Sequence, residues 1–154
     1  HRRTPLLFCE QKASTKAGIA MNDASPDIRW KQRFWNFEKA YQLLERTLDI
    51  ETPSEAERAG LIQFFEMAFE LAWKLLKDYL EEQGFTINSP KAAIKQAFQS
   101  HILADGHAWM DALNDRNLTV HTYEEATAIQ VEQKIRHDYF PLLKNLYGYF
   151  CEKQ

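Results

Sequence analysis

Residues 61–80, LIQFFEMAFELAWKLLKDYL, decide the fold of this 154-residue chain. Their polar side chains are few, and all but Asp78 recur at steps of three or four residues: Gln63, Glu66, Glu70, Lys74 and Lys77. That spacing places them on one narrow face of an α-helix and leaves a wide apolar arc around the rest. Such an arc predicts contacts on several sides, as in the central helix of a bundle or a helix shared with a dimer partner.

Signals at both ends bound this helix. Ser54 and Glu57 have the spacing of a capping box, and Gly84 follows the last periodic residues, so we expect a helix that runs to Gln83.

A second long helix is expected before it. Ser25-Pro26 has the pattern of an N-cap followed by proline at the first helical position, and the apolar periodicity continues to about Ile50. The residues expected to face the core are Phe34, Phe37, Tyr41, Leu44 and Leu48.

The rest of the chain also reads as helices. Ser89-Pro90 predicts a short helix, and Asp105 can cap another that carries Trp109, Leu113 and Val120 toward the core. A last helix is expected from about Tyr123 to Phe150, kinked at Pro141. We therefore predict an all-α, antiparallel up-and-down four-helix bundle with a short additional helix.

Composition and charge exclude several classes of protein. Apolar residues make up 45% of the chain, but no uninterrupted apolar run is long enough to span a bilayer, so no membrane partner is expected. The two cysteines, Cys9 and Cys151, do not require an oxidising compartment, and we expect a cytoplasmic protein.

The first twenty residues differ from the rest. They lack apolar periodicity, and we expect residues 1–20 to be a vector-derived or disordered leader before a helical domain of residues 21–154. They carry four basic residues and one acidic residue, which leaves residues 21–154 with 15 basic and 21 acidic side chains, a formal charge of −6. RNA or nucleotide binding by such a domain requires a local basic site or a partner's surface.

Motifs for common chemistries are missing from the sequence. It contains no GxxxxGK[ST], GxGxxG, HExxH, CxxC or GxSxG, and its five histidines form no metal-binding pair with a third ligand, so no cofactor and no metal are expected. Glu66 and Glu70 lie on one helix face, where we interpret them as solvated surface, with Glu70 and Lys74 as an i, i+4 ion pair.

One short pattern stands apart: R-N-x-x-x-H-x-Y, formed by Arg116, Asn117, His121 and Tyr123 between two expected helices. It combines a permanent cation, an imidazole that titrates near neutral pH and a phenol. From spacing alone, the alternative is a surface arginine, a helix-ending histidine and an aromatic side chain that packs on the next helix.

Four runs of the sequence resemble the HEPN superfamily, specifically the nucleotidyltransferase substrate-binding subunits encoded beside minimal nucleotidyltransferases. They are FFEMAFELAWKLLKDYLEEQGF (64–85), NSPKAAIKQAF (88–98), DRNLTVHTYEE (115–125) and YFPLLKNLY (139–147), and the resemblance covers residues 27–150. It implies that Arg116 and His121 are the catalytic pair of a metal-independent endoribonuclease, with Asn117 as the supporting polar residue.

The resemblance also implies partners and regulation. A homodimer would bring two Arg–His pairs into one cleft for nucleotide or RNA, and AMP transferred to Tyr123 by the minimal nucleotidyltransferase would silence a toxin. Arg116 and His121 converge only if the helix ends between them, which Thr122 as a capping residue would allow. Two other interpretations stay open: a non-catalytic subunit that presents substrate to the nucleotidyltransferase, and a helical oligomerisation module whose Arg–His pair is structural.

Overall fold

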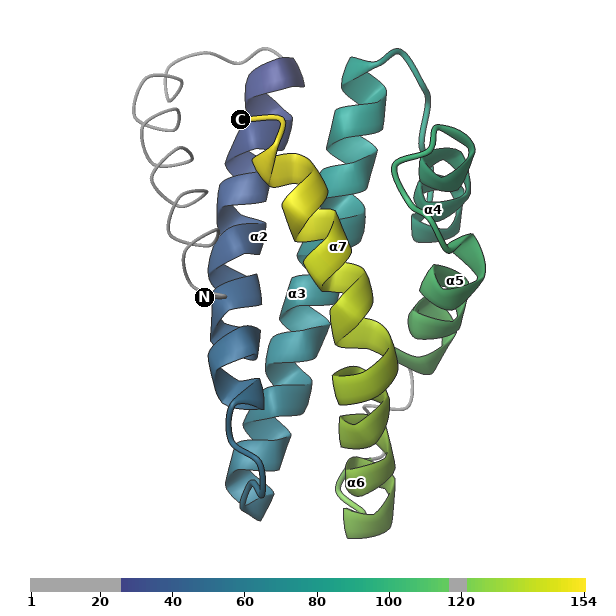
Figure 1. Ribbon diagram of the computed structural model, residues 1–154. Helices are drawn as coiled ribbons and strands as arrows, with labels where there is room; N and C mark the ends of the chain where they lie inside the picture. Colours follow the sequence, from purple (N-terminus) through teal and green to yellow (C-terminus); the bar gives the residue numbers. More distant parts are fainter. Residues whose placement is uncertain (1–25, 117–121) are drawn as a thin grey trace.

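The computed structural model describes residues 26–116 and 122–154 (Figure 1). Every regular element in these ranges is helical: α2 (Pro26–Leu48), α3 (Glu55–Glu82), α4 (Pro90–Gln99), α5 (Gly106–Asp115), α6 (Glu125–Lys134), the π-helical turn η2 (Ile135–Tyr139) and α7 (Phe140–Cys151). The all-α bundle predicted from the sequence is confirmed.

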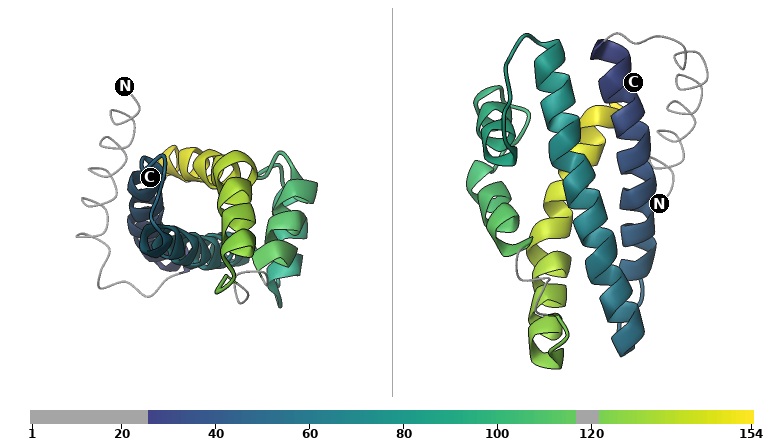
Figure 2. Two further views of the ribbon diagram at one scale, coloured as in Figure 1. Left: turned by 90° about the horizontal axis from the view of Figure 1, so that it is seen from below. Right: turned by 180° about the vertical axis from the view of Figure 1, so that it is seen from behind.

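The long helices α2 and α3 lie side by side and run in opposite directions, and α7 crosses both (Figure 1). The short helices α4 and α5 flank α3 on the side away from α2, as the view from behind also shows (Figure 2). The two short helices thus take the place of one long helix in the bundle.

Most helix starts follow the capping residues of the sequence. Ser54 and Glu57 form the predicted capping box at the start of α3, with Glu57 N donating to Ser54 Oγ at 3.1 Å and Ser54 N donating to Glu57 Oε1 at 2.8 Å. Ser89 caps α4 by accepting from Ala92 N at 3.0 Å. α2 begins at Pro26, and its expected N-cap, Ser25, lies outside the described residues.

Helix α5 is shorter than the sequence suggested. Asp105 caps it as expected, accepting from Ala108 N at 3.0 Å, and Trp109 is buried. The helix ends at Asp115, however, and Val120 lies outside the described residues.

The last helix differs in two ways from the prediction. It begins at Glu125 with Glu124 as N-cap, so neither Tyr123 nor a Thr122 cap starts it. It is also interrupted by η2 directly before α7, where Pro141 stands in the first turn. Because proline has no N–H and clashes with the carbonyl four residues earlier, the wider π turn accommodates it, and the helix axis changes direction between α6 and α7 (Figure 1).

Aromatic rings from α2 and α7 fill the centre of the bundle. Tyr41 is stacked between Phe140 and Tyr147, with ring centroids 5.3 Å and 4.5 Å away. The Tyr147 hydroxyl donates to the buried carboxylate of Glu38 at 2.6 Å, so this polar pair is satisfied inside the core. The predicted core stripe of α2 is fully buried except for Leu48, which is half-buried.

Helix α3 is the central helix, as its apolar arc predicted. It contacts α2, α4, α6 and α7. These contacts cover most of the arc within one chain, and Trp73 and Tyr79 of α3 are partly buried. Phe64, Met67 and Leu71, spaced three and four residues apart on one face, form a smaller patch that is incompletely covered. Met67 is 41% exposed, and the other two are half-buried.

Neither a membrane span nor a metal-binding cluster occurs in the part of the chain that the structure describes. No helix there combines the length and the hydropathy needed to cross a bilayer. No group of three or more histidine, cysteine, aspartate or glutamate side chains there is placed to hold a metal ion.

Candidate functional site at the junction of α5 and α6

The R-N-x-x-x-H-x-Y pattern spans the connection between α5 and α6. Arg116 is the C-cap residue of α5, and Thr122 and Tyr123 form a turn before α6. Asn117 and His121 lie outside the described residues. The helix does end directly at Arg116, which is the condition under which an arginine and a histidine five residues apart can approach each other.

The Arg116 side chain reaches across to α3. Its Nη1 donates to Glu70 Oε1 at 3.1 Å, and Glu70 also pairs with Lys74 at 3.5 Å, as the i, i+4 spacing predicted. The side chains of Arg116 and Glu70 are 34% and 45% exposed, so the pair is open to solvent. Water and salt therefore weaken it, and a phosphate group can compete with the carboxylate for the guanidinium.

The residue before Arg116 is held by a second set of contacts. Asp115 accepts from the Tyr139 hydroxyl and, at 2.9 Å, from Lys134 Nζ. Burial raises the pKa of Asp115, but the two hydrogen bonds outweigh it and leave that pKa below its usual range. Burial and the same carboxylate raise the pKa of Tyr139, so the phenol stays neutral and keeps donating.

The sequence interpretation missed this network. Tyr139 is the last residue of η2, and π-helical turns are frequent at functional sites. Pro141 indicated in the sequence that the last helix is interrupted. The spacing of apolar residues did not show that this interruption turns the Tyr139 side chain toward Asp115.

Tyr123 lies in a different environment from the other tyrosines near the site. It is 76% exposed, whereas Tyr139 is buried at 6%. The Tyr123 side chain is therefore accessible from solvent.

The first turn of α6 is anchored directly after Tyr123. Arg58 of α3 bonds to Glu125 Oε2 at 3.2 Å and to Glu132 Oε1 at 2.8 Å. Arg136 donates to the same Glu132 carboxylate at 2.7 Å and to the carbonyls of Leu48 and Ile50. The connection that carries the motif thus ends on a segment that is fixed to both α3 and the α2–α3 loop.

The helices form an all-α bundle, and the R-N-x-x-x-H-x-Y motif lies between α5 and α6. These two features define a HEPN-type protein. A family model described as nucleotidyltransferase substrate binding protein like matches residues 32–150. The chain belongs to this family.

The chain is also similar to two known proteins. The chain is 29% identical over 82 residues to a probable ribonuclease HepT of Haemophilus influenzae, a match that covers 50% of this chain and 56% of the relative. The match therefore spans little more than half of the curated relative. A crystal structure of a protein from Thermus thermophilus superposes with a TM-score of 0.68 at 37% identity, covering 73% of this chain and 96% of the other.

Proposed function

We propose that this protein is a metal-independent HEPN ribonuclease, the cytoplasmic toxin of a two-component system. In this mechanism a ribose 2′-hydroxyl attacks its own phosphodiester. Arg116 holds the phosphate oxygens through its planar fork, and His121 transfers protons to or from the reacting oxygens. Asn117 supports the pair. The position of Arg116 at the free end of α5, open to solvent, supports this role.

The reaction is proposed to occur in a homodimer. One chain contributes one motif histidine, whereas a twofold dimer provides both a base and an acid in one cleft. The uncovered patch of Phe64, Met67 and Leu71 on α3 supports such an interface, because it lies on the same helix as Glu70, the partner of Arg116.

The proposed antitoxin is a minimal nucleotidyltransferase encoded nearby, which transfers AMP from ATP to Tyr123. The Tyr123 hydroxyl oxygen forms a bond to the α-phosphorus, pyrophosphate leaves, and the phenol proton passes to a base of the enzyme. The attached phosphate would block the cleft and repel RNA. The single observation that carries this proposal is the 76% exposure of Tyr123, two residues after His121.

A second function is favoured by the charges around the site. Arg116 is paired with Glu70, and residues 21–154 carry a formal charge of −6. Both features oppose RNA binding and suit a non-catalytic subunit that presents a substrate to the nucleotidyltransferase.

The experiment that separates the two functions is intact-mass analysis after incubation with the nucleotidyltransferase and ATP. The toxin function predicts a mass increase of one or more AMP groups that is lost in Tyr123→Phe and kept in Tyr149→Phe, which changes a half-buried tyrosine of α7. No increase, with the nucleotidyltransferase active on another substrate, would favour the substrate-presenting subunit.

A further inference from the structure

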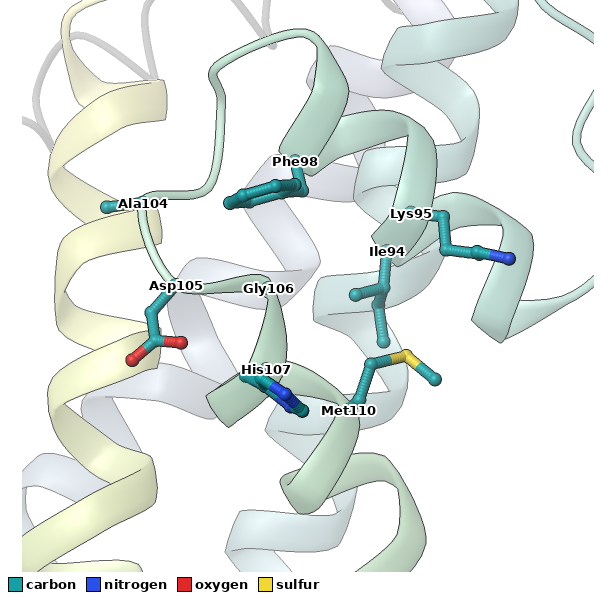
Figure 3. Close-up of a pocket in the computed structure, with 8 residues that line it drawn as sticks. All are labelled: Ile94, Lys95, Phe98, Ala104, Asp105, Gly106, His107 and Met110. Atoms are coloured by element: carbon teal, nitrogen blue, oxygen red, sulfur yellow. The ribbon is translucent and has the colours of Figure 1, made fainter.

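An open pocket of about 400 Å³ lies between α4 and α5, at the opposite end of α5 from Arg116. Arg116 follows Gly106 by ten positions, about 15 Å along the helix axis. The apolar side chains of the pocket come from both helices: Ile94 and Phe98 from α4 and Met110 from α5 (Figure 3). This volume is within the range of small-ligand sites.

Phe98 has an unusual position for a phenylalanine. Its side chain is 49% exposed and lies across the pocket from Met110 and His107 (Figure 3). A Cβ atom on Gly106 would be 3.0 Å from Phe98 Cγ, so glycine allows the ring to lie against the first turn of α5. Gly106 does not have a positive φ, so its backbone conformation does not require glycine. The closeness of the Phe98 ring is what favours glycine at this position.

Two charged side chains flank this apolar surface. The Lys95 ammonium extends to one side of the pocket and the Asp105 carboxylate to the other (Figure 3). Asp105 Oδ1 is engaged with Ala108 N, and the amino end of α5, with its partial positive charge, forms part of the wall. The lining of the pocket thus includes both an exposed aromatic ring and a lysine.

We propose that this pocket binds an unpaired nucleobase together with its phosphate, from a free nucleotide or from single-stranded RNA. A base stacks on the exposed ring of Phe98 regardless of its sequence, and Lys95 attracts the phosphate. The choice of a nucleotide rests on the proposed function, since both candidate functions handle nucleotides or RNA. The site itself is distinct from Arg116 and Tyr123, and its binding can be measured without any catalytic activity.

The test is isothermal titration of the full chain with AMP, and fluorescence anisotropy with a labelled short oligoadenylate. Phe98→Ala and Gly106→Ala should each weaken binding about tenfold, because one removes the ring and the other displaces it. Lys95→Gln should weaken binding and reduce its dependence on salt. Matched controls are Phe85→Ala, another exposed phenylalanine, and Lys91→Gln, one turn before Lys95, and both should bind as wild type.

The two probes distinguish the source of the ligand. Binding of AMP that displaces the oligoadenylate indicates a mononucleotide site, and binding of the oligoadenylate alone indicates an RNA site. Loss of binding in Phe98→Ala supports the pocket even if no RNA is cleaved and no AMP is transferred. Circular dichroism verifies that each variant is folded.

Two results would overturn the proposal. One is that neither probe binds the wild-type protein. The other is that both bind Phe98→Ala as tightly as wild type. If Phe98→Ala instead impairs only the association with the nucleotidyltransferase, the pocket receives a protein side chain and not a nucleotide.

Discussion

The Arg116 guanidinium is paired with the carboxylate of Glu70. Because both side chains are more than a third exposed, the pair contributes little to folding. Glu70→Gln should leave the thermal midpoint almost unchanged and strengthen RNA binding, since it frees the guanidinium for phosphate. Filter binding at several salt concentrations measures this, with Glu66→Gln, one turn earlier on α3, as control. Weaker RNA binding in Glu70→Gln would mean that Glu70 orients Arg116 instead of competing for it.

Glu132 makes the stability of the protein sensitive to acid. Burial raises the pKa of this carboxyl, but hydrogen bonds from Arg58 and Arg136 outweigh burial and hold the pKa below its ordinary value of 4.5. The folded state therefore binds the proton less readily than the unfolded state. The Glu132 carboxylate stabilises the folded protein fully at a pH above its ordinary pKa. This stabilisation is lost as the pH falls through the lower pKa of the folded state.

Glu132→Gln should consequently lose about 1–3 kcal/mol at neutral pH, because the partly buried guanidinium groups of Arg58 and Arg136 lose their charged acceptor. It should also lose less further stability than wild type on acidification below about pH 4.5. Urea unfolding followed by circular dichroism across this range measures both effects. Equal losses in the two proteins below that pH would show that other groups cause the acid sensitivity.

At the scale of helices, replacement by alanine is expected to have opposite effects on stability at two glycines. Gly148 lies within α7 with nothing within 4 Å of an added Cβ, whereas Gly84, after α3, has a φ of +103°. Gly148→Ala should stabilise the protein by about 0.5–1 kcal/mol, and Gly84→Ala should destabilise it. Thermal unfolding of the two variants is the measurement. A lower midpoint for Gly148→Ala would indicate that this face of α7 is covered in the folded protein.

Helix starts were predictable because they depend on local chemistry. Ser54, Ser89 and Asp105 satisfy amide donors within three residues of themselves, so the sequence contains the whole interaction. The end of α5 was not predictable in this way. The last residue of α5, Asp115, accepts a hydrogen bond from Tyr139, 24 positions later. The position of Tyr139 depends on a π turn that the apolar periodicity does not reveal.

For the whole molecule, the oligomeric state is the main prediction. Light scattering should give the mass of a dimer at micromolar concentration, with an interface of more than about 1,200 Å² in total. Met67→Lys should produce a folded monomer, because it places a charge in the uncovered patch of α3. Ile129→Lys is the control, since Ile129 is similarly exposed at 40% but lies on α6. A wild-type monomer would contradict the composite site.

The candidate site was predictable from the sequence only as a set of residue types. The motif indicated that Arg116 and Tyr123 belong to one connection, and the structure places them at its two ends, with Tyr123 exposed. The carboxylate facing Arg116 comes from α3, 46 positions earlier. Periodicity assigned Glu70 only to the solvated face of its helix, because the packing of α5 against α3 depends on the whole fold.

Cleavage of a labelled RNA in the presence of a metal chelator tests the proposal that Arg116 and His121 cleave RNA. The wild-type protein should cleave this RNA, and His121→Ala should lose about a hundredfold or more of the rate, the range that a general acid or base contributes. Arg116→Lys should also be impaired, because an ammonium cannot reproduce the bidentate fork. Both variants should stay folded by circular dichroism. Wild-type rates in a folded His121→Ala would contradict the account.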